Sequence, residues 1–343
     1  MLINKYSFVD IIPVTLFCYI LSKDEVDCMY SKDDLLKRKV RDVKITKGMT
    51  VSGLINQMGD IGGFSAQHMV DSIDIVGKML KDKDSFNFLS FPADIVSTGL
   101  RGVLAGMVKY FDAIITTGGT LDHDIARATG GIYNVGSFNA DDKEMHKAGV
   151  FRLGNVFIEN EEYGLQLENE FNKVMDEIYA SAGHKEEYSA SEIIREFGKR
   201  MKDDGSILKQ AYDHNVPIYC PGILDGAFGT QMTLFSQDHK FKLNLLADEL
   251  ELSNLMCDHK TTGALMIGGG ISKHHVIWWN QFKGGLDYAA YITTATQYDG
   301  SLSGARLSEA VSWGKIKEDA RYVTVDGDAT IILPIIAAAL DLE

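Results

Sequence analysis

The densest group of chemically capable side chains in this 343-residue sequence lies within residues 298–315. Glu309 and Trp313 are four positions apart and would share one face of a helix. A carboxylate beside an indole ring is a suitable site for an alkylammonium ion. Gly314 would end that helix and free Lys315 to point into a site. A lysine near apolar and aromatic groups can lose its proton and act as an amine nucleophile. A single lysine is more often a solvated surface residue, so this interpretation depends on the neighbours.

A second segment combines backbone flexibility with a titratable ring. Gly268, Gly269 and Gly270 follow an apolar run and can form a backbone cradle, and Lys273 and His274 come directly after them. An isolated histidine is usually structural. A histidine just after a glycine cradle is a better candidate for a general acid or base.

Two further segments have weaker signals. Thr117, Gly118 and Gly119 end an apolar run and would allow close approach to a phosphate or ribose, although the spacing is not GxGxxG. Asp225 lies among glycines within residues 221–229, where it could bind ribose hydroxyls or an amine, or simply form a turn.

The residues after the first of these segments allow a metal hypothesis. Asp122, His123 and Asp124 are possible metal ligands. Adjacent residues rarely converge on one ion without further, spaced ligands, so a metal site is the minority interpretation.

The composition restricts the possible partners. The net charge of −14 disfavours a nucleic-acid-binding surface and favours cationic ligands, although an acidic surface also simply maintains solubility. The four cysteines contain no CxxC pair, which favours reduced thiols in the cytoplasm over a zinc, redox or disulfide framework.

These segments must be positioned by a larger framework. Helical periodicity is expected over residues 50–81, 94–110 and 329–340. An acidic stretch, residues 159–204, is expected to form exposed helices. Apolar runs alternate with the helices and predict buried strands at residues 86–91, 113–117, 216–221, 264–267, 288–292 and 322–325. This alternation predicts an α/β fold: a Rossmann-like, mostly parallel sheet with helices on both faces, in a single large domain with helical decoration.

The amino terminus is expected to be separate from that domain. Residues 1–32 are predicted to be an N-terminal extension and residues 33–343 the NAD-binding catalytic domain. The apolar stretch at residues 6–21 contains Asp10 and Pro13 and is short for a membrane span. One hypothesis is that Met29 is the native start.

Three blocks of this sequence resemble deoxyhypusine synthase. They are GGGISKHH at residues 268–275, YDGSLSGAR at 298–306 and EAVSWGKI at 309–316. The TTGGTLDHD run at residues 116–124 is more similar to the archaeal branch of the family than to the eukaryotic one. The resemblance covers residues 33–343 and is most contiguous after residue 264.

The resemblance implies an activity. Members are cytoplasmic homotetramers with NAD in sites at a dimer interface. They oxidise spermidine, cleave the resulting imine, and pass the aminobutyl group through an enzyme-lysine imine to one lysine of the translation initiation factor 5A precursor. It implies neither a resident metal nor a nucleic-acid or membrane partner.

The resemblance also implies residue roles. Lys315 matches the covalent nucleophile and His274 the catalytic base. Residues expected at the substrate are Glu309, Trp313, Asp225 and Ser303. Residues expected at the cofactor are Thr117, Gly118, Gly119, Asp225, Gly268, Gly270, Thr294, Ala295, Asp299, Ser301, Asp328 and Ala329, with Asp94 near its far end.

Two departures from the family pattern keep alternatives open. Eukaryotic members have acidic residues where this chain has Thr230 and Leu302, and each lost carboxylate removes a contact of about 1.5–3 kcal/mol to a substrate ammonium. The rivals are a homospermidine-synthase-like transfer to a free diamine, an NAD-binding partner subunit with little activity, and a metal-dependent ureohydrolase-like enzyme suggested by residues 122–124.

Overall fold

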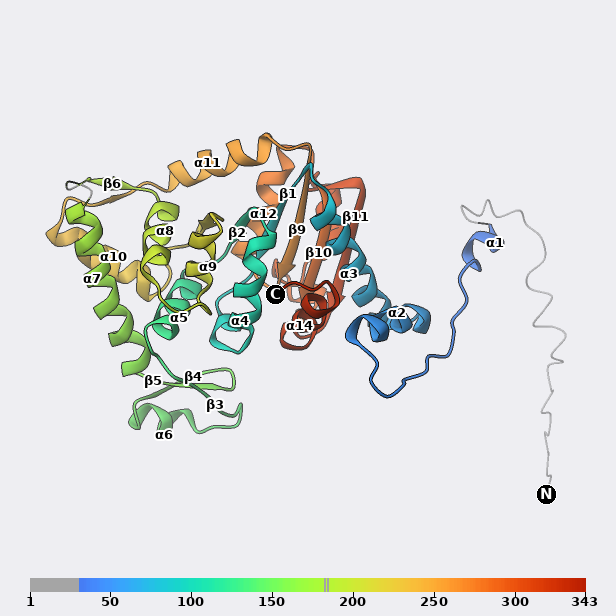
Figure 1. Ribbon diagram of the computed structural model, residues 1–343, viewed down its shortest axis with the longest axis horizontal. Helices are drawn as coiled ribbons and strands as arrows, with labels where there is room; N and C mark the ends of the chain where they lie inside the picture. Colours follow the sequence, from blue (N-terminus) through green and yellow to red (C-terminus); the bar gives the residue numbers. More distant parts are fainter. Residues whose placement is uncertain (1–30, 182, 184) are drawn as a thin grey trace, which may run out of the picture. The chain divides into compact units, whose positions relative to one another are not determined.

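The structure is a computed structural model that describes residues 31–181, 183 and 185–343 (Figure 1). The chain divides into two compact units, Met1–Arg41 and Asp42–Glu343. In the first unit, the described residues contain one short helix, α1 (Lys32–Leu35). The hypotheses about Met29 and residues 6–21 fall outside the described residues. The boundary at residue 33 stays a prediction.

The second unit is built on a six-stranded sheet with strand order β11-β10-β9-β1-β2-β7. Every neighbouring pair in this sheet is parallel. The strands are β1 (Ser85–Ser90), β2 (Ala113–Ile115), β7 (Ile218–Tyr219), β9 (Thr261–Ile267), β10 (Leu286–Thr293) and β11 (Ile316–Asp326). The predicted parallel α/β architecture is therefore confirmed, with each predicted strand at or near its expected place.

Helices cover both faces of this sheet. Because alternate residues of each strand point to opposite faces, the sheet contributes to two separate apolar clusters. In β1, Leu89 belongs to one apolar cluster and Phe88 to the other. The Leu89 face packs against α3 (Phe64–Lys81), α4 (Leu100–Met107), α5 (Gly118–Ala128) and α14 (Ala329–Ala339). The Phe88 face packs against α11 (Leu245–Cys257), α12 (Ile271–Gln281) and α13 (Leu307–Ser312). Helices on both faces confirm the second part of the fold prediction.

Two predicted helices are interrupted. The helical pattern over residues 50–81 divides into α2 (Val51–Ile61) and α3 at Gly62, whose φ of 69° ends α2 in the left-handed region. The pattern over residues 94–110 forms α4 flanked by two 3-10 turns, η2 (Asp94–Ser97) and η3 (Val108–Tyr110).

The acidic stretch forms helices, but they are not fully exposed as predicted. A π-helical turn, η4 (Glu161–Leu165), precedes α7 (Gln166–Ser181), and α8 (Ala190–Arg200) follows. Phe171 of α7 and Phe197 of α8 are buried and both contact Phe228 of α10 (Ala227–Asp238). Each helix is therefore amphipathic, with its acidic residues outside and aromatic residues in the core. Nearby are α9 (Ile207–Asp213) and the paired strands β6 (Glu187–Tyr188) and β8 (Lys242–Leu243).

The sequence interpretation missed a small antiparallel sheet between α5 and α7, drawn at the bottom of Figure 1. Its strands are β3 (Tyr133–Val135), β4 (Val150–Leu153) and β5 (Val156–Glu159), and α6 (Asp142–Lys147) joins β3 to β4. Gly154, with φ of 61°, turns the chain between β4 and β5. A Gly-Asn pair between two apolar runs is a recognised hairpin signal, so the sequence did contain the evidence. Within the described chain, no helix has the length and apolarity needed to cross a bilayer.

Candidate active site

The carboxyl ends of β9, β10 and β11 meet at one edge of the sheet and border a cavity of about 690 Å³. In parallel α/β sheets this edge is where ligands bind. We call this space the sheet-end cavity. Its lining includes these sequence-predicted residues: Gly268, Gly270, Thr294, Ala295, Ser303, Asp328, Ala329 and Asp94. Local strand endings therefore bring together most of the predicted cofactor-binding residues of the C-terminal half.

The glycine turn after β9 leaves room for a ligand. Gly268 and Gly269 have φ of 56° and 90°, a region that favours glycine. A Cβ atom at Gly270 would meet nothing within 4 Å. The neighbouring Ser272 hydroxyl is buried and has no hydrogen-bond partner within the described chain. Exposed backbone and an unpaired hydroxyl at the start of α12 are groups that a phosphate-containing ligand can use.

Asp328 is one of two acidic residues that line the sheet-end cavity, the other being Asp94. The Asp328 side chain accepts a hydrogen bond from the backbone N–H of Thr330, at 2.8 Å, and so caps α14. A carboxylate fixed in this way can still accept hydrogen bonds from ribose hydroxyls. Together with the glycine turn and the cavity's size, this donor and acceptor set fits a dinucleotide such as NAD.

Part of the wall of this cavity comes from the small antiparallel sheet that the sequence interpretation missed. Phe138, the β4–β5 turn at Gly154 and Asn155, and the flanking Leu153 and Val156 all line it. The hairpin signal could have predicted the strands, but not that they lie against residues 268–270.

A second, smaller space of about 160 Å³ contains the predicted catalytic residues, and we call it the lysine cavity. It is lined by Lys273, His274, Ile277, Leu302, Ala305, Arg306, Glu309, Ala310, Trp313 and Lys315. Lys315, His274, Glu309 and Trp313, which were selected from the sequence, therefore line a single cavity.

Local chain geometry places Lys315 there. After α13 ends, the N–H of Gly314 donates to the Val311 carbonyl at 2.9 Å and the N–H of Lys315 to the Ala310 carbonyl at 3.0 Å. This is a Schellman motif, with Gly314 at a φ of 67°. This turn is the physical basis for the predicted role of Gly314, which was to end the helix and release Lys315.

The Lys315 side chain lies near two indole rings. The residue is 8% exposed, and its Nζ lies 5.2 Å from the ring centroid of Trp313 and 5.6 Å from that of Trp278. No carboxylate in the described part of the chain forms an ion pair with it. The amine is therefore not held by a local salt bridge.

His274 lies on the wall beside Lys315. Its ring stacks on Trp278, with centroids 5.6 Å apart and 26° between the planes. Burial lowers the pKa of His274 below its usual value, and the charges of Lys315 and His275 lower it further. The imidazole is therefore neutral near neutral pH and able to accept a proton.

Several predicted cofactor residues line neither cavity within one chain. Gly118 packs against the loop that carries Asp225, where an added Cβ would lie 2.6 Å from the Asp225 carbonyl oxygen. Thr117 and Gly119 lie at the same helix start, at the beginning of α5. Their cofactor role stays a prediction.

Asp299 and Ser301 form an exposed local turn. The Asp299 carboxylate accepts from both the N–H and the hydroxyl of Ser301, at 2.7 Å each. These bonds lower the pKa of Asp299. Neither residue lines the two cavities, so their cofactor role also stays a prediction.

The carboxylates of the Asp122-His123-Asp124 run are occupied by structural contacts. Asp122 accepts the N–H groups of Ala227 at 2.9 Å and Phe228 at 2.7 Å, and so holds the start of α10. Asp124 accepts Arg101 Nε at 2.6 Å. Among the residues that the structure describes, no group of three or more His, Cys, Asp or Glu side chains could hold a metal ion.

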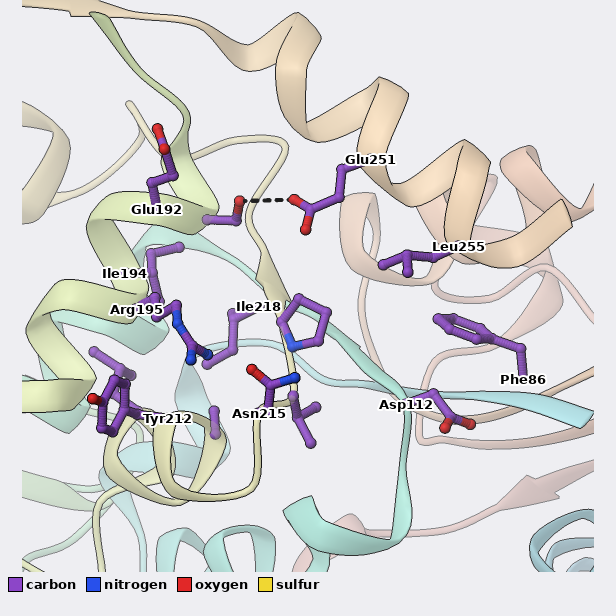
Figure 2. A pocket seen from close by; sticks show the side chains of 15 residues that line it. Phe86, Asp112, Glu192, Ile194, Arg195, Tyr212, Asn215, Ile218, Glu251 and Leu255 are labelled. Atoms are coloured by element: carbon purple, nitrogen blue, oxygen red, sulfur yellow. Dashed lines mark hydrogen bonds between the residues drawn. The ribbon is translucent and has the colours of Figure 1, made fainter. Parts of the chain in front are cut away.

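A third cavity, of about 400 Å³, lies where strands begin rather than end (Figure 2). Phe86 stands at the start of β1, Asp112 just before β2 and Pro217 just before β7. Figure 2 shows Arg195 and Tyr212 on one wall and Glu251 on another. It contains none of the residues selected from the sequence, so it is separate from the candidate active site.

A parallel α/β sheet has a dinucleotide-sized cavity beside a smaller one lined by an unpaired lysine and a neutral histidine. This arrangement is typical of an enzyme that acts on amines. The family model for deoxyhypusine synthase matches residues 53–340. Proteins named "Probable deoxyhypusine synthase" from Picrophilus torridus and Thermoplasma acidophilum are each 49% identical over 310 residues, covering 90% of this chain and 98% of the relative. The chain therefore belongs to the deoxyhypusine synthase family, whose activity is aminobutyl transfer.

A solved structure is consistent with the fold. The crystal structure of an Entamoeba histolytica protein assigned as a deoxyhypusine synthase aligns with a TM-score of 0.58 and 20% identity, covering 88% of this chain and 96% of that one. At this identity the likeness shows the architecture alone.

Proposed function

We propose that this protein transfers the aminobutyl group of spermidine to one lysine of the translation initiation factor 5A precursor, with NAD as cofactor and an imine at Lys315 as the covalent intermediate. The observation that carries the proposal is the lysine cavity. A buried, unpaired lysine, a neutral histidine and a carboxylate beside an indole line one small space. Family membership supports the reaction class.

NAD fits the sheet-end cavity through residues of this chain. The glycine turn at residues 268–270 offers backbone to the phosphates, and Asp328 offers an acceptor to a ribose. When bound, NAD supplies a hydride acceptor for amine oxidation and later returns the hydride.

The chain's own residues supply the proton and amine chemistry. His274, uncharged near neutral pH, accepts a proton from the substrate amine as it is oxidised. The Lys315 amine then forms a carbon–nitrogen bond to the four-carbon unit and displaces the diaminopropane fragment as its leaving amine. Glu309 and the 61%-exposed Trp313, at the cavity mouth, suit the remaining ammonium end.

The two departures from the eukaryotic pattern lie in different places. Leu302 lines the lysine cavity, where it offers an apolar wall to the methylene chain. Thr230 is exposed on α10, and its hydroxyl donates to the Gly226 carbonyl at 3.0 Å. In this proposal Glu309 and cation–π contacts hold the substrate where eukaryotic members use additional carboxylates.

The complete site is proposed to form in a cytoplasmic homotetramer. Thr117, Gly118, Gly119, Asp225, Asp299 and Ser301 line neither cavity of their own chain. A site shared between subunits would give these residues a role next to a partner's cofactor.

Borohydride trapping with NAD and spermidine, read by peptide mass spectrometry, tests the proposal. The expected result is an added aminobutyl mass on Lys315, absent in Lys315→Arg. Lys317→Arg is the matched control, because Lys317 lies two residues after Lys315 and its amine is held in an ion pair with Asp287 at 2.6 Å. In a parallel reaction without borohydride, the aminobutyl group should pass from Lys315 to the factor 5A precursor and not to putrescine. An adduct on another lysine refutes the assignment of Lys315 as the nucleophile. So does the absence of any adduct when NAD is bound.

A further inference from the structure

A short loop separates the two cavities of the candidate active site. It runs from η5 (Gln297–Asp299) to α13. Ser303 on this loop lines the sheet-end cavity, whereas Leu302 and Ala305 line the lysine cavity. The backbone position of residues 302–305 therefore sets the distance between the sheet-end cavity and the lysine cavity.

Side chains, not backbone pairing, hold this loop. Lys273 Nζ donates to the Leu302 carbonyl at 3.0 Å and to the Ala305 carbonyl at 2.6 Å. The Tyr291 and Thr293 hydroxyls donate to the intervening Ser303 carbonyl at 2.7 and 3.0 Å. Within the described chain, no backbone N–H reaches these three carbonyls. The loop's internal bonds, from Gly304 and Ala305 to the Ser301 carbonyl at 3.2 Å each, do not tie it to the sheet.

Lys273 is an unusual residue to find in this position. It is 1% exposed and forms no ion pair with any carboxylate of the described chain, and its Nζ lies 3.8 Å from the ring centroid of Tyr291. Burying an unpaired ammonium is costly, and an apolar side chain of similar length would avoid that cost. Burial lowers the pKa of Lys273 to about 8, which Glu309 opposes and Arg306 reinforces. The hydrogen bonds to the loop are the interaction that offsets this cost.

We propose that Lys273 is a positioning residue whose ammonium ties the 302–305 loop to α12 and thereby fixes the spacing between the lysine cavity and the sheet-end cavity. Lys273 immediately precedes His274 on α12, so the same helical turn holds the loop and presents the histidine. The loop attachment is a property of the fold alone. Its effect on turnover rests on the proposed function.

Hydrogen exchange measured by mass spectrometry on the ligand-free protein tests the attachment. Lys273→Met keeps the length of the side chain and removes the donors. The backbone amides of residues 302–306 are expected to exchange roughly tenfold faster or more, because two charge-assisted hydrogen bonds are lost.

Lys283→Met is the matched control. Lys283 follows α12 and also donates to backbone carbonyls, those of Met256, at 2.9 Å, and of His259, but it lines neither active-site cavity. Its loss is expected to leave exchange in residues 302–306 unchanged. Equal exchange of this loop in wild type and Lys273→Met overturns the proposal, whatever the activity of either protein.

Kinetics separate positioning from simple stabilisation. Lys273→Met is expected to lower kcat for aminobutyl transfer at least roughly tenfold, while its urea midpoint stays close to that of Lys283→Met. Lys273→Arg can still donate to both carbonyls and should recover part of the lost kcat. A faster-exchanging loop with unchanged kcat refutes the positioning role. Lys273→Leu, which also removes the ammonium donors, gives the same test if Lys273→Met does not fold. A wild type without transferase activity would refute the proposed function but leave the exchange result standing.

Discussion

Replacing Asp124 by alanine is expected to destabilise the protein by about 3–5 kcal/mol, because it breaks a buried ion pair and leaves an arginine partly uncompensated. Asp124 is fully buried, and Arg101 is nearly so. The carboxylate accepts Arg101 Nε at 2.6 Å and the Ser206 hydroxyl at 2.7 Å. It also accepts the N–H of Leu208, at 2.9 Å, in the first turn of α9.

The magnitude follows from what remains after the substitution. Burial works to lower the pKa of Arg101, but Asp124 and Asp203 overcome this and raise it, so the guanidinium stays charged. Asp203, at 2.7 Å, remains as a partner but is itself partly exposed. Loss of the contacts to α9 adds about 1 kcal/mol, the usual effect of removing a helix cap.

Urea unfolding followed by circular dichroism measures this loss. Asp142→Ala is the matched control, because Asp142 forms a paired contact with Arg152, at 2.5 and 2.7 Å, that is exposed to solvent and screened. Its effect should be much smaller. A loss below about 1 kcal/mol for Asp124→Ala would refute the structural role. So would the release of a bound divalent ion on substitution, which would revive the metal hypothesis for residues 122–124.

Three further outcomes are expected. Burial, and then Arg127, lower the pKa of His123 to about 4. The neutral ring therefore stabilises the fold fully above about pH 6.5, and about 3 kcal/mol of unfolding free energy is lost as the pH falls toward 4. Urea titrations at pH 7 and 4.5 should show a smaller loss of stability in His123→Gln than in the wild type, and an equal loss would contradict this. Gly314→Ala forces a φ of 67° on a residue with a Cβ, which costs about 1–2 kcal/mol. Borohydride trapping at Lys315 should slow by more than this loss of stability accounts for. An unchanged trapping rate would contradict the role of the turn in placing Lys315. Trp313→Ala should raise KM for spermidine about twofold to fivefold, because an exposed cation–π contact of about 0.5–1 kcal/mol is lost. KM for NAD should not change, and a shift in the NAD value alone would place Trp313 elsewhere.

Features encoded by local sequence could be predicted well. Six apolar runs became the six strands of one parallel sheet. Central strands such as β1 and β9 are buried on both faces and therefore need no alternation of apolar and polar residues. The release of Lys315 from α13 depends on a glycine at a helix end, which is also a local signal. Features that depend on tertiary packing could not be predicted in this way. The wall of the sheet-end cavity that contains Phe138 and the β4–β5 turn exists only because segments distant in the sequence meet there.

Glycine illustrates the limit most clearly. The pairs at residues 118–119 and 269–270 look equivalent in sequence, since each follows a strand and could admit a phosphate. In the structure, space beside Gly270 is open, whereas Gly118 is needed because the Asp225 carbonyl lies against it. A sequence pattern shows that a side chain is excluded at a position, but not whether a ligand or the chain's own backbone excludes it.

Two lysines line the same cavity, and their hydrogen bonds distinguish their chemistry. Lys273 Nζ donates to two carbonyls and lies over the Tyr291 ring, so its orientation is fixed by the fold. An amine that attacks carbon must turn its lone pair toward that carbon, which for Lys273 would mean giving up the bonds that hold the loop. Lys315 Nζ lies near two indole rings and forms no hydrogen bond or ion pair within the described chain, so its orientation is not fixed in this way. Although burial lowers the pKa of Lys273, the geometry favours Lys315 as the nucleophile, because an available lone pair requires freedom of orientation as well as loss of a proton.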